Sequence, residues 1–230
     1  MGLLMSRNLA IIGSYNMPLV KEGLKRKKSY EKWAMNNLFT AFRGIKFTRW
    51  FELHDFKKSG RRYLRRSSGY YGRYDSIAKY MAAINRLNIP VYMQKKWKNI
   101  KKSKPFPFQE VMETFDTEYF GCSFAWMIAL ALLEHLKGRK ISKIVLLGVG
   151  LTGHEYYFQR PSTEYFCGIA KGLGVKIEVD TATSNILTAP YIYAYKENHQ
   201  LIDINYVSVV KTLGDMISIP MQEYFERILL

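Results

Sequence analysis

Asparagine side chains follow two stretches of sequence that are typical of buried strands. Asn16 comes shortly after the apolar run at 8–13, and Asn36 and Asn37 lie at the end of the run that begins at Tyr30. Each carboxamide offers a paired donor and acceptor that can bind the edge of a base or a ribose. Asparagine after a strand is also a common turn residue, and that alternative stays open at each position. Together the three amides predict a nucleotide-binding edge.

Two tyrosines and an arginine follow the strongest predicted strand, at 143–149. The hydroxyls of Tyr156 and Tyr157 can hold a phosphate, and Arg160 can add a bidentate contact. The ordinary alternative for a tyrosine is half-buried packing. The remaining candidates for nucleotide binding at the ends of predicted strands are Gly13, Ser14 and His54.

A glycine-rich stretch after the same strand matches the dinucleotide pattern only in form. Gly148, Gly150 and Gly153 have the spacing GxGxxG, and Asp180 ends the next predicted strand as a ribose-binding acid would. In that pattern the third glycine opens the helix, whereas here HEYYFQR intervenes before Pro161. A tight turn is therefore the favoured interpretation, and an NAD-dependent enzyme stays a third possibility.

Predicted strands alternate with predicted helices along most of the chain. We expect strands at 8–13, 30–36, 47–53, 89–94, 143–149 and 175–180, and helices from Pro18 and at 75–87, 121–137 and 161–173. This alternation predicts an α/β, Rossmann-like fold, with a mainly parallel sheet and helices on both faces. Residues 1–230 are expected to form a single domain, with a hairpin and a helix in a C-terminal extension at 191–230. Ligands of such sheets bind beyond the carboxyl ends of the strands, where the candidates above lie.

The positive charge is concentrated in the first half of the chain. Lys and Arg number 35 against 19 acids, for a net charge of +16, and residues 1–108 hold 25 of the cations but only 5 of the acids. Two basic segments, 56–75 and 95–104, also contain Tyr or Trp, which favours phosphate neutralisation with base stacking. The predicted nucleic-acid contacts are Lys57, Lys58, Arg61, Arg62, Arg65, Arg66, Lys95, Lys96, Lys98, Lys101 and Lys102. A surface that is merely rich in lysine is the alternative to a polyanion partner.

The cysteines and histidines are too few and too scattered for a metal site or a disulfide framework. There are 2 Cys, without a CxxC pair, and 4 His, so we expect no metal and a reduced, cytoplasmic protein. The apolar stretch at 120–133 is too short to cross a bilayer and predicts a buried helix. The first residues lack the pattern of a secretory signal.

The order of several motifs resembles a known family. AIIGSYNMP, WAMNNLF, RWFELH, CSFAWMIALALLE and KIVLLGVGLTGHEYYF resemble the Rossmann-like bacterial sialyltransferases and motility-accessory-factor glycosyltransferases over about residues 8–190. WFELH, IPVYMQ and YFQRPSTEYF are also similar to a group of uncharacterised bacteriophage proteins, and a phage-encoded protein would be expected in the host cytoplasm. The resemblance implies a nucleotide-sugar donor over the strand ends. It matches Asn16, Asn36 or Asn37, Ser123 at the start of the apolar helix, and Tyr156 or Tyr157 at the donor phosphate.

The chain departs from these transferases at the catalytic base. The sialyltransferases carry a His base on a lid after the strong strand, but here that connection is about ten residues and its sole His is His154. The available acid or base groups are His154, Glu155 and Glu164, although Glu164 also suits the first turn of a helix. We expect metal-independent glycosyl transfer from a nucleotide-sugar donor to a polyanion such as DNA. The alternative is a non-catalytic phage protein that binds nucleotides or nucleic acid, in the virion or against a host defence.

Overall fold

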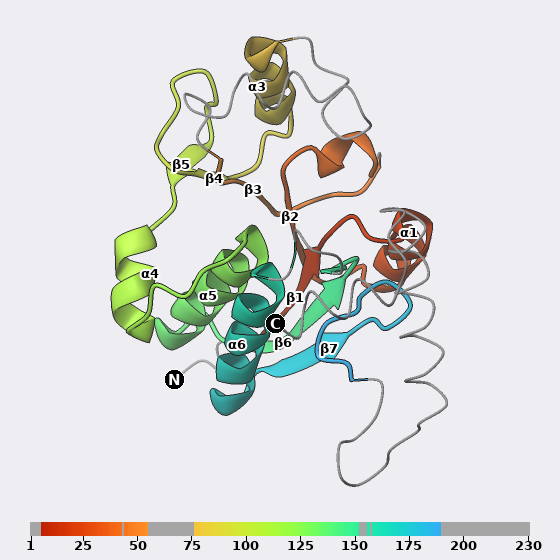
Figure 1. Ribbon diagram of the computed structural model, residues 1–230. Helices are drawn as coiled ribbons and strands as arrows, with labels where there is room; N and C mark the ends of the chain where they lie inside the picture. Colours follow the sequence, from red (N-terminus) through yellow and green to blue (C-terminus); the bar gives the residue numbers. More distant parts are fainter. Residues whose placement is uncertain (1–5, 43, 55–75, 152–155, 157, 190–230) are drawn as a thin grey trace, which may run out of the picture. The chain divides into compact units, whose positions relative to one another are not determined.

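A seven-stranded sheet organises the computed structural model, which describes residues 6–42, 44–54, 76–151, 156 and 158–189 (Figure 1). All strand pairs are parallel, and the order across the sheet is β5-β4-β3-β2-β1-β6-β7. The strands are β1 Arg7–Ile12, β2 Glu31–Met35, β3 Arg49–Glu52, β4 Val91–Met93, β5 Ser103–Pro105, β6 Ile141–Leu147 and β7 Lys176–Val179. The chain builds outward from β1 to β5 and then returns to the other side of β1. This places the topological switch point, the usual ligand position, between β1 and β6.

Helices cover the sheet on both faces, so the predicted α/β, Rossmann-like fold is confirmed (Figure 1). The helices are α1 Met17–Arg26, α3 Ile77–Arg86, α4 Phe108–Phe115, α5 Ser123–Leu136 and α6 Gln159–Gly172, with a short 3-10 helix at Leu38–Thr40. The side chains of β1 from Leu9 to Ile12 and of β6 from Ile144 to Leu147 are fully buried. Such continuous apolar runs are expected of parallel strands that are covered on both sides.

Two elements at the sheet's edge were not predicted from the sequence. The basic segment 95–104 ends in β5, whose Lys104 and Pro105 are exposed, as is common for an edge strand that must not pair further. The prolines that follow do not merely break the chain, because Pro107 directly precedes α4. Helix α6 begins two residues before Pro161, so Glu164 lies in its second turn and not in its first.

The chain divides into two compact units, Met1–Ile186 and Leu187–Leu230, and the sheet lies in the first. The predicted C-terminal extension at 191–230, with its hairpin and helix, and the basic segment at 56–75 fall outside the described residues. Of the second unit, only residues 187–189 are described. The single domain expected over 1–230 therefore stays a prediction.

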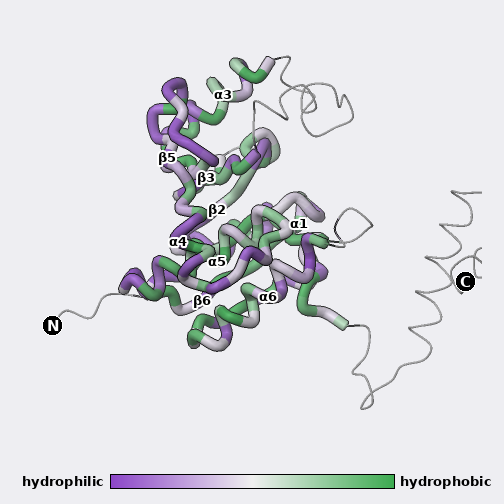
Figure 2. Tube along the Cα trace, turned by 60° about the vertical axis from the view of Figure 1, so that its left-hand side comes forward, coloured by the Kyte–Doolittle hydropathy of each residue, from purple (hydrophilic) through white to green (hydrophobic). Residues whose placement is uncertain are grey.

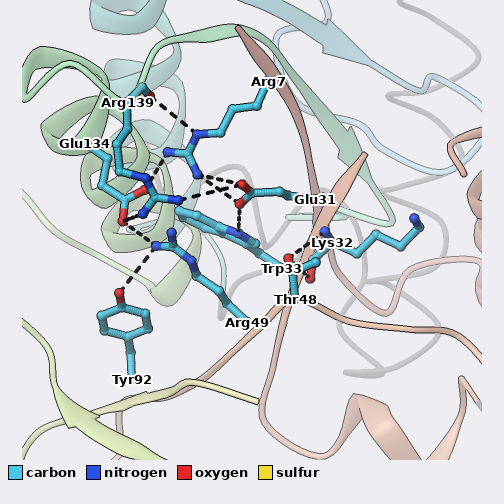
Figure 3. A network of polar contacts seen from close by, with 9 residues as sticks. All are labelled: Arg7, Glu31, Lys32, Trp33, Thr48, Arg49, Tyr92, Glu134 and Arg139. Carbon is cyan, nitrogen blue, oxygen red and sulfur yellow. Dashed lines mark hydrogen bonds and ion pairs between the residues drawn. The ribbon is translucent and has the colours of Figure 1, made fainter. Parts of the chain in front are cut away.

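A network of ion pairs fixes α5 to the amino ends of the central strands (Figure 3). Glu134, in the last turn of α5, accepts hydrogen bonds at 2.5 Å from both Arg7 of β1 and Arg49 of β3. Arg7 also bonds both carboxylate oxygens of Glu31 at 2.9 Å, and the Arg49 guanidinium lies 4.4 Å from the Trp33 ring centroid. Because α5 runs antiparallel to the strands, anchoring its carboxyl end here places its amino end at the opposite, ligand-binding edge.

Candidate functional site

A cavity of about 870 Å³ lies over the carboxyl ends of four strands, which is within the range of small-molecule sites. Its walls come from the residues that follow β1, β2, β3 and β6, from the start of α5, and from the residues that precede and open α6. The fold thus brings together segments that are far apart in the sequence. The predicted site residues that line the cavity are Gly13, Ser14, Asn36, Asn37, His54, Ser123 and Tyr156.

The other predicted residues are placed elsewhere or fall outside the described residues. Asn16 precedes α1, and its Nδ2 donates to the carbonyl of Ala182 at 3.3 Å. Arg160 and Glu164 form an ion pair along α6 at 2.8 Å, and neither lines the cavity. His154, Glu155 and Tyr157 are not among the described residues, and neither are Lys57, Lys58, Arg61, Arg62, Arg65 and Arg66.

Two buried amide oxygens in the cavity wall have no hydrogen-bond partner in the described structure. They are the Oδ1 atoms of Asn36 and Asn37, and Asn37 as a whole is 4% exposed. The backbone groups of Asn36 are already hydrogen-bonded within the protein. Asn36 N donates to the Phe51 carbonyl at 2.9 Å, and the indole of Trp50 donates to the Asn36 carbonyl at 2.9 Å. Asn36 also has a positive φ of 55°. An unsatisfied buried polar group costs about 1–3 kcal/mol, so a new hydrogen bond to either oxygen would offset part of that cost.

The amino end of α5 lines the cavity, and its first backbone amides have no hydrogen-bond partner among the described residues. Cys122, its N-cap, makes no capping bond through its side chain, and the first turn contains no acid. The first bond of the helix runs from Trp126 N to the Cys122 carbonyl. Such a terminus, with its free amides and positive dipole end, favours an anion such as a phosphate.

Close packing of α5 against α6 fixes the position of this helix end. Gly121 N donates to Ser162 Oγ at 2.9 Å, and a Cβ on Gly121 would lie only 2.3 Å from the Phe158 carbonyl oxygen. The Cys122 thiol lies 3.1 Å from Thr163 Oγ1. Because the helix start is held by neighbours on α6, its amides are preorganised toward the cavity.

A buried carboxylate orients the histidine of the cavity. Glu52, the last residue of β3, is 1% exposed, and its Oε1 lies 2.6 Å from His54 Nδ1. Its Oε2 accepts a hydrogen bond from the Tyr80 hydroxyl of α3. Sequence reasoning missed Glu52 and Tyr80, although a glutamate inside the aromatic strand and two residues before His54 was an available signal.

Three amides of the glycine-rich loop after β6 are occupied by the protein itself, and Gly153 lies outside the described residues. Thr183 Oγ1, Ser184 Oγ and Asn185 Oδ1 accept from the backbone amides of Gly148, Val149 and Leu151 at 3.1, 3.0 and 2.8 Å. A dinucleotide loop needs such amides for the pyrophosphate.

The glycines themselves are explained by packing of the strand ends. A Cβ on Gly13 would lie 2.2 Å from the Gly148 carbonyl oxygen, and a Cβ on Gly150 would meet the Tyr15 ring at 2.3 Å. Asp180 Oδ1 accepts from Ala182 N within its own turn at 3.2 Å. These contacts favour the tight-turn interpretation over an NAD site.

The described basic surface lies between β4 and β5 and is hydrophilic in Figure 2. Its exposed lysines are Lys95, Lys96, Lys98, Lys101, Lys102 and Lys104. None of them pairs with an acid among the described residues, and the segment 95–104 contains no acid. The Lys95 ammonium lies 5.0 Å from the Trp97 ring centroid. These six lysines lie within ten consecutive residues, and we call them the lysine patch.

Within the described ranges no three His, Cys, Asp or Glu side chains gather into a possible metal site. The helices of that part of the chain are also too short or too polar to span a bilayer. Comparison with family models, with curated proteins and with solved structures found no match. The resemblance to sialyltransferases, motility-accessory-factor glycosyltransferases and phage proteins therefore stays a hypothesis.

Proposed function

We propose that the protein is a nucleotide-binding transferase, a glycosyltransferase that uses a nucleotide-sugar donor. The observation that carries the proposal is the pair of oxygens Asn36 Oδ1 and Asn37 Oδ1, which have no hydrogen-bond partner among the described residues. Both asparagines line the cavity that the α5 amino end also lines. Acceptors for a base or ribose thus stand close to donors for a phosphate. A nucleoside phosphate carries both kinds of group on one molecule.

The chemistry of transfer suits the same arrangement. In an inverting reaction the acceptor oxygen attacks the anomeric carbon while the bond from that carbon to the donor phosphate breaks. The leaving phosphate gains negative charge, which the amides at the start of α5 would stabilise. Tyr156 lines the cavity and offers a further hydroxyl. The resemblance noted in the sequence supports this assignment, because Ser123 and the strand-end asparagines match donor-binding positions of those transferases.

Thermal unfolding with a panel of nucleotides tests the proposal. The panel contains CMP, UDP, GDP, ADP-ribose and NAD, each with the full chain. A ligand at 100 times its Kd stabilises a folded protein by about 2.7 kcal/mol, which raises the Tm by several degrees. We expect at least one of the mononucleotides to do this. If no nucleotide raises the Tm, the proposal is wrong.

A second candidate function, nucleic-acid binding, is favoured by the lysine patch. Six exposed lysines without acidic partners can neutralise phosphates, and the adjacent Trp97 can stack on a base. The two functions are compatible, since a polyanion such as DNA would then be the acceptor of the transfer. If the protein catalyses no transfer reaction, the lysine patch would belong to a non-catalytic nucleic-acid-binding protein.

A further inference from the structure

The geometry points to His54 as the catalytic base that deprotonates the acceptor hydroxyl, with Glu52 and Tyr80 as its positioning residues. This assignment rests on the proposed transferase function and differs from the candidates named from the sequence. Glu164 does not line the cavity, and His154 and Glu155 lie outside the described residues. It starts from the position of His54, which follows β3 at the sheet's carboxyl edge and lines the same cavity as Asn36 and Asn37. Its side chain is 34% exposed, so it is neither sealed in the core nor fully in solvent.

The contact to Glu52 sets which ring nitrogen carries the proton. A carboxylate accepts a hydrogen bond, so the 2.6 Å contact places the proton of a neutral imidazole on Nδ1. The basic lone pair is then on Nε2, the nitrogen that a carboxylate–histidine pair presents to its substrate.

The hydrogen bond from Tyr80 completes this support. With Glu52 almost fully buried, each of its oxygens has a partner: His54 on one and the Tyr80 hydroxyl of α3 on the other. Replacing a buried ionic pair by apolar residues of similar size is often neutral or stabilising, so the burial of Glu52 is weak evidence for a role in stability. Of the three residues only His54 lines the cavity. A role in orienting His54 therefore explains the burial of Glu52 better than packing does.

The reaction step balances without a further reagent. His54 Nε2 takes the proton of an acceptor hydroxyl, and the oxygen's electron pair forms a bond to the anomeric carbon of the donor. The bond from that carbon to the phosphate oxygen breaks, and its electron pair leaves with the nucleotide. The imidazolium then returns its proton to solvent.

Substitution of His54 tests the assignment on the full chain. His54→Asn keeps a donor where Nδ1 was but has no base, whereas His54→Ala leaves room for added imidazole. Nucleotide release is measured from CMP-, UDP- and GDP-sugars with DNA as acceptor, beside nucleotide affinity and the Tm. We expect both variants to bind nucleotide within about threefold of the unaltered protein. Loss of a general base lowers kcat by about 10²–10⁴-fold, and imidazole should restore part of the activity of His54→Ala.

Variants of the two positioning residues and of a control histidine complete the experiment. Glu52→Gln and Tyr80→Phe should lower kcat with little change in KM, and Glu52→Gln should alter the pH profile of kcat. His135→Gln, at the far end of α5, should leave kcat unchanged. Unimpaired kcat in His54→Asn, or binding without turnover by the unaltered protein, overturns the assignment of a base. If no sugar nucleotide binds the unaltered protein, the proposed function fails, and the role of His54 with it.

Discussion

At the scale of single residues, the buried amide oxygen of Asn37 should lower the stability of the protein but strengthen its binding of a nucleotide. Asn37 Oδ1 is desolvated without a partner, so an apolar residue of similar size should relieve that cost. We predict that Asn37→Leu leaves the free energy of unfolding unchanged or raises it by about 1 kcal/mol. The same variant should bind nucleotide at least tenfold more weakly, as measured by calorimetry. Equal affinity in both proteins would show that Asn37 does not contact the nucleotide.

The two cysteines differ in a way that reports on occupancy of the cavity. Burial, with a smaller contribution from Glu164, raises the pKa of Cys167 to about 12, so its thiol should resist alkylation in the folded protein. Cys122 lines the cavity and is partly exposed. We predict that iodoacetamide modifies Cys122 first and that a bound nucleotide slows this reaction several-fold, as followed by mass spectrometry. Alkylation of Cys167, which is buried in the folded protein, is followed in urea as the reference reaction. The nucleotide should not slow this reaction.

The sequence predicted those site residues whose position depends only on following a strand. Asn36, Asn37 and His54 could be named because strand ends share one edge of a parallel sheet, whereas Ser123 was named only from the family resemblance. Glu52 could not, since its use depends on burial and on Tyr80, which approaches from a separate helix. The occupied amides of the glycine-rich loop depend likewise on Thr183, Ser184 and Asn185, which lie more than thirty residues away.

At the scale of elements, α5 is held at both ends, and its carboxyl end can be tested separately from the site. Burial by itself would raise the pKa of Glu134, but hydrogen bonds and charges from Arg49 and Arg7 outweigh it and hold the pKa below the ordinary value of 4.5. A carboxyl whose pKa is lowered on folding stabilises the protein above its unfolded pKa. This stabilisation is lost as the pH falls through the folded pKa.

We therefore predict that Glu134→Gln lowers the free energy of unfolding at neutral pH by about 2 kcal/mol, between the values typical of surface and buried pairs. In acid, well below pH 4.5, the difference from the unaltered protein should vanish. Urea unfolding at both pH values measures this. Glu22→Gln, which removes an exposed pair with Lys25, is the control and should have a much smaller effect. A difference that persists in acid would mean that the charge of Glu134 is not what stabilises α5.

Most elements were predictable because their apolar periodicity is local, and the exceptions lie at the sheet's edge. Strand β5 has only three residues, SKP, within a run of lysines, so no hydrophobic pattern marks it. It forms because β4 offers an edge with which it can pair, in the register Tyr92↔Lys104. Helix α4 was not predicted because the prolines at 105 and 107 indicated a break in the chain, although Pro107 directly precedes the helix.

At the scale of the whole molecule, the cations behind the net charge of +16 have different roles. Several cations, such as Arg7 and Arg49, are used inside the ion-pair network, whereas those of the lysine patch have no acidic partner among the described residues. We predict that the full chain binds DNA with an affinity that falls steeply with salt. Replacing Lys95, Lys96, Lys98, Lys101 and Lys102 by Gln should reduce the slope of log K against log salt by up to about 0.9 per lost contact.

The control removes the same charge from other exposed positions: Lys21, Lys28, Lys140, Lys171 and Lys176. Both variants lose five cations, so a difference between them reports placement and not net charge. Equal slopes in the two variants would contradict a specific role of the lysine patch. A slope near zero in the unaltered protein would contradict nucleic-acid binding altogether.

Amide hydrogen exchange of the full chain, with and without a saturating mononucleotide, locates the ligand most directly. The amides of residues 123–125 precede the first bond of α5 and should exchange freely without ligand. A phosphate at the start of α5 should slow their exchange, while the amides of Gly148, Val149 and Leu151, already bonded within the protein, should change little. Protection that spares residues 123–125 and falls elsewhere would contradict a nucleotide site at this edge of the sheet.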